Sequence, residues 1–541
     1  MESSAEPPSL PPSSSRLRRA AGSLGPLQEF SPLAATVLLG ATVLLSRIIG
    51  YAREAYIAYA FGAGPTTDAY VAAFTLPDVL NYLMAGGTAA ITFISIYTRY
   101  ASAGREEEAR KSFSVILTVM TVALTVGVVL AGVFARPIER VIFPDFTDEQ
   151  LDLCVALTRI LLPAQIFFYA GGVVSAVLMS RRMFLYPALA PLLYNVGIIL
   201  GGVFLGPRLG VAGLAVGAVV GCFAGPFLIN ALGAKAAGVR YRPSWDISEA
   251  GFREWIALTI PLMLGVTLVT ADEWILRFFA SGSPGDITRL NYAKRLFAVP
   301  IAVLAQATAQ AALPFFASTF GENRREEFAA TVNRAVYRVT AASLLLTGWM
   351  MATAFPLVDL VYRRGRFAIS DSEQTAEYFF WFALSLALWS AQSLYARAFY
   401  AAGDTRTPMI AGTIITALSL PVYSWMFERY SVVGLPMASG VGILAHTLAL
   451  AVLLDRKKLV PLRSFPWKEL AKVLFTAALA ALAAFGVRDK LANYDYVTGW
   501  MALAAISAAW LAATALWLWV TRSDLPGMLW RRAARPPTAP S

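Results

Sequence analysis

The sequence predicts an all-α polytopic membrane protein with about fourteen transmembrane helices. Of its 541 residues, 57% are hydrophobic and only 15% are charged, whereas soluble globular domains carry roughly 25% charged residues. Apolar stretches long enough to cross a hydrocarbon core of about 30 Å recur along the whole chain. Stretches of this length form helices, because backbone groups in lipid must be hydrogen-bonded internally and barrel strands are shorter. A third observation is that part of the sequence occurs twice.

The apolar stretches follow one another from residue 33 to residue 521. They cover residues 33–57, 67–97, 112–135, 151–179, 186–205, 210–232, 254–280, 288–317, 330–355, 374–402, 408–427, 432–454, 468–487 and 498–521.

Four patterns of the first half return in the second half at offsets between 218 and 221 residues. The repeated patterns are Phe61-x-x-Gly64-x-x-x-Asp68 with Phe279-x-x-Gly282-x-x-x-Asp286, Arg105-Glu106-Glu107 with Arg325-Glu326-Glu327, the run from Ala135 to Phe143 with that from Ala354 to Tyr362, and Pro187 with Pro408. Such duplication is typical of transporters. Six spans in each copy place both halves the same way up. We therefore expect two six-helix lobes related by a pseudo-twofold axis along the membrane normal, plus two C-terminal helices.

This repeat also divides the chain into domains. We expect a disordered cytoplasmic tail at 1–30, an N-lobe at 31–232, an interfacial linker at 233–252, a C-lobe at 253–455, the two additional spans within 456–521, and a cytoplasmic tail at 522–541.

The net charge of +11 reflects topology rather than nucleic-acid binding. Basic residues gather in alternate loops, and the loops between them are poorer in Lys and Arg, with the cluster at 363–366 as the exception. By the positive-inside rule, both termini and the basic loops are cytoplasmic.

Catalytic and metal-binding motifs are not found in the sequence. It has no Walker loop, no HExxH, no Cys/His cluster and no nucleophile–base pair, so we expect neither an enzyme nor an ATP-driven pump, and no metal or organic cofactor. Cys154 and Cys222 are expected to be small buried hydrophobes. His446, the only histidine, is expected to be a packed helix residue rather than a proton relay.

Ionisable residues within spans are costly and mark candidate binding sites. The first span carries Arg47, Arg53 and Glu54, and Gly50 lets this helix bend or approach another backbone. The alternative is that Arg47 reaches the head-group layer while Arg53 and Glu54 pair locally.

Two further spans carry charges. Asp272 and Glu273 are candidates for a cation- or proton-coupling site, although Glu273 can instead pair with Arg277 one helical turn away. In the following span, Lys294 and Arg295 are candidates to face a phosphate, since arginine binds phosphate oxygens through a two-pronged fork.

Several motifs resemble the MurJ/MviN family of bacterial lipid II flippases. They are SRIIGYAREAYIAYAFGAGPTTDAYVAAFTLPDVL at 46–80, SRRMFLYPALAPLLYN at 180–195, YAKRLFAVP at 292–300, VYRRGRFAISD at 361–371 and ARAFYAAGDTRTP at 396–408. The resemblance implies the multidrug/oligosaccharidyl-lipid/polysaccharide exporter fold. It also implies translocation of undecaprenyl-pyrophosphoryl-disaccharide-pentapeptide from the cytoplasmic to the outer leaflet.

The resemblance also suggests roles for individual residues. Arg47, Arg53, Glu54 and Arg295 match charged substrate-binding positions, and Asp68 matches a family acidic position with a gating or structural role. The chain departs from the family where Asn81 replaces an arginine, Gly86 a glutamate and Ala298 an acidic residue. Pyrophosphate binding would then depend on Arg53 and Arg295, with Arg47 or Lys294 compensating.

These observations together predict a lipid II flippase of the bacterial inner membrane that works by alternating access. The membrane potential or a monovalent cation would supply the energy, and the two additional spans would hold the lipid tail. Its partners would be lipid II and membrane lipids, with other cell-wall synthesis proteins as further candidates. The alternatives are a drug/cation antiporter or another polyprenyl-linked oligosaccharide exporter of the same superfamily, or a receptor that only binds lipid-linked precursors.

Overall fold

A computed structural model describes residues 32–85, 87–181, 183–263, 268–322, 324–491, 499–525 and 527. Every element in this part of the chain is a helix, which confirms the all-α class. The N-terminal tail, most of the C-terminal tail and Gly86 lie outside the described residues.

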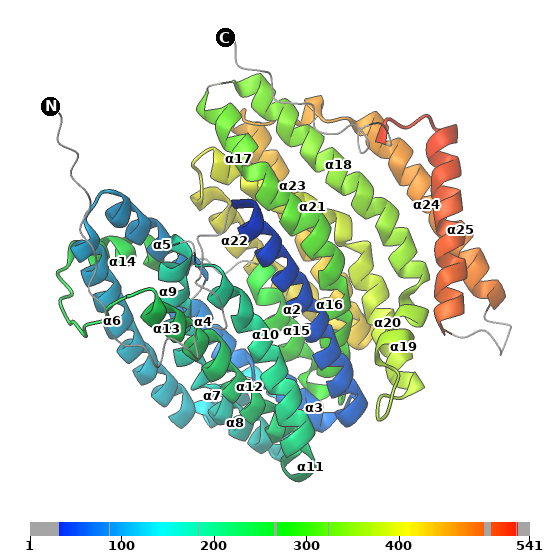
Figure 1. Ribbon diagram of the computed structural model, residues 1–541. Coiled ribbons are helices and arrows are strands. Elements are labelled where there is room, and N and C mark those ends of the chain that lie inside the picture. The colour runs from blue at the N-terminus through cyan, green and yellow to red at the C-terminus, as the bar shows by residue number, and fades with distance from the viewer. Residues whose placement is uncertain are drawn as a thin grey trace.

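The first half of the chain forms helices α2 to α13 (Figure 1). They are α2 (Pro32–Phe61), α3 (Pro65–Ala72), α4 (Thr75–Ala85), α5 (Gly87–Ser102), α6 (Glu106–Val133), α7 (Ala135–Ile142), α8 (Asp148–Leu161), α9 (Ala164–Ser180), α10 (Leu185–Leu200), η1 (Gly201–Leu205), α11 (Gly206–Leu209), α12 (Val211–Cys222), η2 (Phe223–Ile229) and α13 (Asn230–Ala236).

The second half forms helices α14 to α25. They are α14 (Ala250–Met263), α15 (Leu268–Phe279), η3 (Ala280–Gly282), α16 (Asp286–Pro300), η4 (Ile301–Ala307), α17 (Thr308–Gly321), α18 (Arg325–Ala352), α19 (Ala354–Tyr362), α20 (Ile369–Leu384), α21 (Leu386–Ala401), α22 (Arg406–Tyr430), η5 (Ser431–Val433), α23 (Gly434–Arg456), η6 (Leu462–Ser464), α24 (Trp467–Leu491) and α25 (Gly499–Val520).

The expected spans all overlap helices, but several are interrupted. Pro163 separates α8 from α9, and the π-helical segments η2 and η4 contain or follow Pro226 and Pro300. Proline has no backbone N–H and removes a hydrogen bond of the helix, so the helix changes pitch or bends there. Among the residues that the structure describes, eight helices are long and apolar enough to cross a membrane, or up to ten if each bent pair is one span. The multi-span character is confirmed, whereas the number fourteen stays a prediction.

The duplication is visible in the order of the helices. A helix of 28 residues, α6, leads into the short α7, and a helix of 28 residues, α18, leads into the short α19. Figure 1 shows the helices of the two halves as neighbouring groups, with α2 between them. We call them the N-terminal group and the C-terminal group. The start of α2 and the end of α25 both face the top of that view.

Small residues set the spacing within the N-terminal group. The C-terminal end of α10 and the following η1 pack on α12. A Cβ at Gly201 would lie 2.4 Å from the carbonyl oxygen of Gly213. Any side chain there would force the two backbones apart, so this packing requires glycine.

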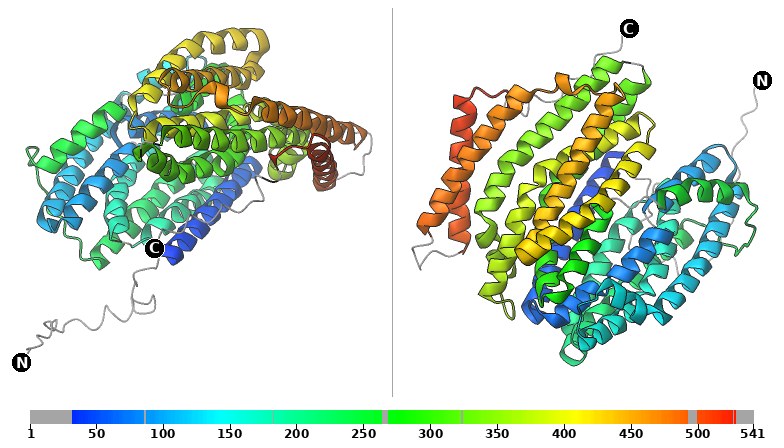
Figure 2. Two further views of the ribbon diagram at one scale, coloured as in Figure 1. Left: turned by 90° about the horizontal axis from the view of Figure 1, so that it is seen from above. Right: turned by 180° about the vertical axis from the view of Figure 1, so that it is seen from behind.

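The seventh expected span is divided between the two groups. Its first part, α14, packs against α5 and α6, whereas α15 packs against α22 and α23. The domain boundary at residue 253 stays a prediction. At the opposite edge, α24 and α25 pack on each other and on α18, and they stand apart from the N-terminal group in both further views (Figure 2).

Candidate functional site

The first helix places a buried ion pair between the two groups of helices. Arg53 contacts the carboxylate of Glu54, and its guanidinium also donates to Asn195 Oδ1 at 2.9 Å. Asn195 is in turn held by the carbonyl of Pro191 at 3.0 Å, so α10 fixes the direction of the Arg53 side chain. Gly50 faces the same amide, and a Cβ there would lie 3.9 Å from Asn195 Oδ1. The local pairing of Arg53 and Glu54 was one of the two expected outcomes.

Arg295 approaches this pair from α16. Its Nε lies 3.8 Å from Glu54 Oε1, and its backbone carbonyl accepts a hydrogen bond from the Tyr51 hydroxyl at 3.1 Å. The Arg295 side chain is 46% exposed, although α16 packs against α20 and α3. Arg295 therefore presents its guanidinium to an open cavity.

Arg277 provides a third guanidinium, and three partners hold this group in place. It donates to Thr75 Oγ1 at 3.0 Å, and it lies 3.4 Å from Glu273 Oε2 and 3.7 Å from Asp78 Oδ2. The pair with Glu273 was one of the two alternatives that the sequence left open, and the structure contains it. Asp78 was missed, and its signal was an acidic residue inside a predicted span.

These side chains line a cavity of about 240 Å³ between the two groups. Among the described residues, its wall carries three arginines and three carboxylates, so the formal charges cancel. The six are Arg53, Arg277, Arg295, Glu54, Asp78 and Glu273. Of the three arginines, Arg295 is the one for which the described residues provide no hydrogen bond to a carboxylate.

A larger cavity of about 590 Å³ adjoins the first. The two share Asp78, Glu273, Phe74 and Tyr194 in their walls. Asn81 lines the larger cavity and donates to Gln165 Oε1 at 2.7 Å. No arginine or lysine is among the described residues of its wall.

Lys294 and Asp272 pair with each other within the C-terminal group. The Lys294 ammonium contacts the Asp272 carboxylate, which is fully buried and also accepts from the Tyr423 hydroxyl. Asp272 is thus already neutralised, and of the two acids considered for ion coupling only Glu273 faces the cavities. Arg47 is exposed on α2 and lines neither cavity.

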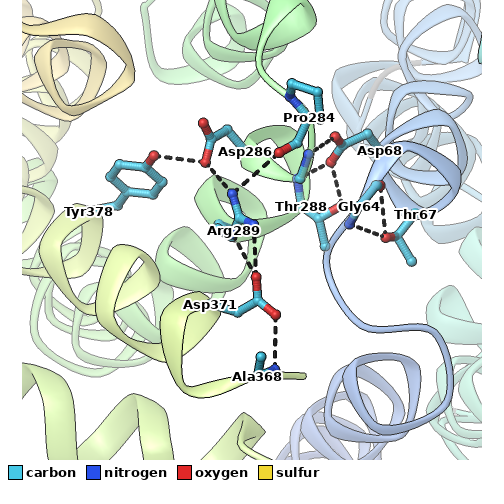
Figure 3. Close-up of polar contacts among 11 residues, drawn as sticks. Gly64, Thr67, Asp68, Pro284, Asp286, Thr288, Arg289, Ala368, Asp371 and Tyr378 are labelled. Atoms are coloured by element: carbon cyan, nitrogen blue, oxygen red, sulfur yellow. Dashed lines mark hydrogen bonds and ion pairs between the residues drawn. The ribbon is translucent and has the colours of Figure 1, made fainter. Parts of the chain in front are cut away.

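Asp68 joins the two groups at one end of the molecule (Figure 3). It lies in α3, and its carboxylate accepts hydrogen bonds from the backbone N–H groups of Gly285 and Thr288 and from Thr288 Oγ1 at 2.6 Å. An aspartate at this position satisfies free N–H groups and complements the positive end of the α16 dipole.

Its counterpart in the repeat makes different contacts. Asp286 accepts from Arg289 and from the Tyr378 hydroxyl, both at 2.8 Å. Arg289 also binds Asp371 of α20 through two nitrogens at 2.8 and 2.9 Å (Figure 3). This network anchors α16 within its own group.

A second contact closes the same end. Arg366 N donates to Tyr59 O at 2.9 Å, and Gly365, at φ +61°, lies so close that a Cβ there would be 2.3 Å from the same oxygen. The end of α2 and the loop between α19 and α20 therefore touch through their backbones. We refer to this contact and the Asp68–α16 contact together as the closed gate. Figure 1 places it at the bottom, opposite the start of α2 and the end of α25.

Other expectations concern residues outside the cavities. Cys154 and Cys222 are free and buried, as predicted. His446 lies in α23 and is 1% exposed, so it is a packed helix residue, as predicted. In the part of the chain that the structure describes, no group of three or more His, Cys, Asp or Glu side chains could hold a metal ion.

Comparisons with known proteins support one family. The family model described as lipid II flippase MurJ matches residues 57–523. A probable lipid II flippase of Vibrio cholerae is 26% identical over 428 residues, with 75% of this chain and 79% of the relative covered. The Burkholderia cenocepacia lipid II flippase is 28% identical over 424 residues, with 75% and 80% covered.

Solved structures agree on the fold. A structure described as lipid II flippase MurJ in an inward closed conformation superposes with a TM-score of 0.77 at 20% identity, covering 91% of this chain and all of that one. An inward-facing multidrug transporter of the MATE family gives 0.59 at 14% identity, covering 79% and 98%. The match over residues 57–523 establishes that this chain belongs to the MurJ family of lipid II flippases.

Proposed function

We propose that this chain moves lipid II from the cytoplasmic to the outer leaflet of the inner membrane and that Arg295, assisted by Arg53, binds the pyrophosphate. The protein is a transporter and not an enzyme. The observation that carries the site assignment is the half-exposed Arg295 guanidinium in a cavity between the two lobes.

The physical problem is the transfer of a pyrophosphate and polar sugars past hydrocarbon. An isolated charge in a low-dielectric medium costs many kcal/mol, whereas a guanidinium fork offers two charge-assisted hydrogen bonds to phosphate oxygens. Arg53 and Arg277 are held by carboxylates before the substrate arrives. Arg295 can bind phosphate without first breaking a hydrogen bond to a carboxylate.

The balanced charges of the cavity wall suit a carrier that must return without substrate. With pyrophosphate bound, the site becomes anionic, and an inside-negative membrane potential favours its movement outward by about 2.3 kcal/mol per charge per 100 mV. A monovalent cation remains the alternative coupling agent, and Glu273 is the acid that it would meet in the cavities.

Transport by alternating access requires the closed gate to open. If both termini are cytoplasmic, as the positive-inside rule predicts, the closed gate faces the periplasm and the structure corresponds to the cytoplasm-facing form. Opening would break the hydrogen bonds of Asp68 to α16 and that of Arg366 to Tyr59.

Other parts of the chain receive supporting roles in this proposal. The lipid tail would lie along α24 and α25, which carry exposed apolar side chains such as Leu482 and Leu511. Membrane lipids would surround this edge, and other cell-wall synthesis proteins are further candidate partners. Arg47 would reach the head-group layer.

Growth of a strain depleted of its own flippase tests the site. Arg53→Ala and Arg295→Ala should fail to support growth although each protein accumulates to the normal level. Arg47→Ala serves as the matched control, because Arg47 lies on the same helix as Arg53 but lines neither cavity. Normal growth with Arg295→Ala would exclude the pyrophosphate site.

A further inference from the structure

The loop between α19 and α20 is the exception to the charge pattern of the sequence. It carries Arg363, Arg364 and Arg366, although the proposed orientation places it at the outer end of the molecule. The positive-inside rule gives outer loops few Lys and Arg residues. Topology therefore does not explain this cluster.

Two of the three guanidinium groups are available to an anion. Arg363 is paired, since its Nε lies 2.6 Å from Asp359 Oδ1 of α19. Arg364 and Arg366 are exposed, and within the part of the chain that the structure describes no hydrogen bond or ion pair holds either guanidinium. A guanidinium binds phosphate oxygens through two parallel charge-assisted hydrogen bonds, so the pair suits a phosphate or pyrophosphate group.

The backbone of this loop is fixed at the closed gate. Arg366 N donates to Tyr59 O at 2.9 Å, and a Cβ at Gly62 would lie 2.8 Å from Arg366 O. The ring of Phe367 is buried and meets that of Tyr292 in α16 edge to face, with centroids 5.7 Å apart. The loop therefore presents its two available guanidinium groups from a fixed position where α2 meets the C-terminal group.

The loop also lies at the outer end of the helix that carries Arg295. Because α16 begins at Asp286 beside the closed gate, a rise of 1.5 Å per residue places Arg295 about 14 Å further inward. Arg289 and Lys294 lie on the same stretch of α16, but both are already paired with aspartates. A pyrophosphate that moves outward from Arg295 along α16 would therefore pass two occupied cations before it reached the loop.

The surroundings of the loop favour a lipid-linked anion over an acidic protein. The loop is short, since α19 ends at Tyr362 and α20 begins at Ile369. Exposed Tyr59 and Ile369 lie beside it at the ends of their helices. Aromatic side chains at the ends of transmembrane helices are typical of the lipid head-group layer, where the phosphates of lipids are found.

We propose that Arg364 and Arg366 form a release site, which binds the pyrophosphate of lipid II on the outer side once the closed gate has opened. The inference rests on the proposed function and extends it. Opening separates Arg366 from Tyr59, so the head group would pass between the two surfaces that meet there. The two guanidinium groups replace the contact with Arg295, and their exposure to water lets the pyrophosphate leave again.

Translocation of lipid II by the purified full chain in proteoliposomes tests the release site. Arg364→Gln/Arg366→Gln removes both charges but keeps the backbone contact with Tyr59. Translocation should become about tenfold slower, whereas the affinity for undecaprenyl pyrophosphate in lipid nanodiscs should change less than about twofold, because Arg295 is unaltered. Arg364→Lys/Arg366→Lys keeps the charges and should lose less than the glutamine variant.

Arg208→Gln is the matched control. Arg208 is also an exposed arginine, but it lies on α11, which packs on η1 and α12 of the N-terminal group. This variant should translocate lipid II like the wild type. An equal loss with Arg208→Gln, equal rates for the lysine and glutamine double variants, or a wild-type rate for the glutamine double variant would overturn the release site. A defect of the glutamine double variant in cells but not in proteoliposomes would also overturn it and would indicate an acidic protein partner.

Failure of the proposed function has a different signature. Arg295→Ala should weaken binding of undecaprenyl pyrophosphate and slow translocation together. If Arg295→Ala leaves that binding unchanged, the pyrophosphate site is wrong, whatever the loop variants show. If Arg295→Ala behaves as expected and the glutamine double variant is fully active, only the release site is wrong.

Discussion

Arg295 differs from the other cavity arginines because, among the described residues, it is not hydrogen-bonded to a carboxylate. Its nearest carboxylate oxygen is 3.8 Å away, whereas Arg53 contacts Glu54 directly and Arg277 lies between two acids. A hydrogen bond to a charged group contributes about 1.5–3 kcal/mol, but only if its partner is not already occupied. In the proposed mechanism, the exposure of this one side chain therefore makes it the position at which an anionic substrate binds at the lowest cost.

Substitution of Arg295 by lysine tests the importance of the guanidinium fork. Lys keeps the charge but binds as a point charge, so we expect Arg295→Lys to retain partial lipid II binding and Arg295→Ala to lose about 10- to 100-fold in affinity. Binding to purified protein gives the order. Equal affinities for the Lys and Ala variants would show that the charge itself contributes nothing.

The Asp272–Lys294 pair calls for a different experiment, because both side chains are largely buried. Removal of one partner leaves an uncompensated charge and costs about 3–5 kcal/mol, whereas removal of both can be nearly neutral. We expect Lys294→Met to lower the melting temperature of the purified protein strongly and Asp272→Asn/Lys294→Met to restore most of it. A double variant that is stable but does not transport would support a coupling role in addition to the structural one.

The sequence located most of the charged residues of the site and their local pairs, but not the pairs between segments distant in sequence. Arg53, Glu54 and Arg295 stand out because charges are rare in spans, and Glu273–Arg277 follows from helical spacing. The contact of Arg295 with Glu54 joins residues from different lobes, and no local spacing encodes it. Asp78 was missed because its partner, Arg277, likewise lies about 200 residues away.

At the scale of helices, prolines explain several but not all of the interruptions of the expected spans, since the bend between α20 and α21 contains no proline. Pro163, Pro226 and Pro300 lie at or beside a break or a π-helical segment. These positions could be read from the sequence, whereas the division of the seventh span between two groups could not. The apolar run at 254–280 is continuous in composition, and only tertiary packing assigns its two parts to different neighbours.

The start of α22 offers a test outside the membrane. Asp404 accepts from Thr407 N at 2.9 Å and Thr407 Oγ1 at 2.6 Å, and it contacts Lys457 at the end of α23. Burial alone would raise the pKa of Asp404, but the bonds from Lys457 and Thr407 outweigh burial and lower it from 3.8 to about 2. Its stabilisation is therefore present above about pH 4 and is lost as the pH falls towards 2.

Asp404→Ala should destabilise the start of α22 by about 1 kcal/mol at pH 7, and Asp404→Asn by less, because asparagine keeps an acceptor for Thr407 N. Melting temperatures of the purified variants check this order. An alanine variant as stable as the wild type would contradict the proposed role of the cap.

For the whole molecule, the repeat was the most informative sequence feature. It predicted two groups with the same order of helices, which the structure shows in α6–α7 and α18–α19. It did not predict that the two copies of the Phe-x-x-Gly-x-x-x-Asp pattern act differently. Asp68 reaches across to α16, whereas Asp286 is bound by Arg289 and Tyr378 of its own group. The asymmetry arises from the surroundings of each copy, which the pattern itself does not specify.

A glycine at the closed gate tests whether the two groups must touch there. A methyl group at Gly365 would lie 2.3 Å from Tyr59 O, so Gly365→Ala should prevent closure and abolish growth support. Gly403→Ala is the control, since Gly403 also has a positive φ, of +77°, but a Cβ there meets nothing within 4 Å. If both variants behave alike, backbone strain rather than the contact explains the effect.

In the proposed mechanism, Arg295 holds the pyrophosphate while lipid II crosses the membrane. This role is tested by the fraction of lipid II that is accessible in the outer leaflet of cells whose own flippase is depleted. With the wild-type chain, this fraction should return to that of undepleted cells. With Arg295→Ala at the same protein level, it should stay as low as in depleted cells. Full outer-leaflet accessibility with Arg295→Ala would contradict the claim.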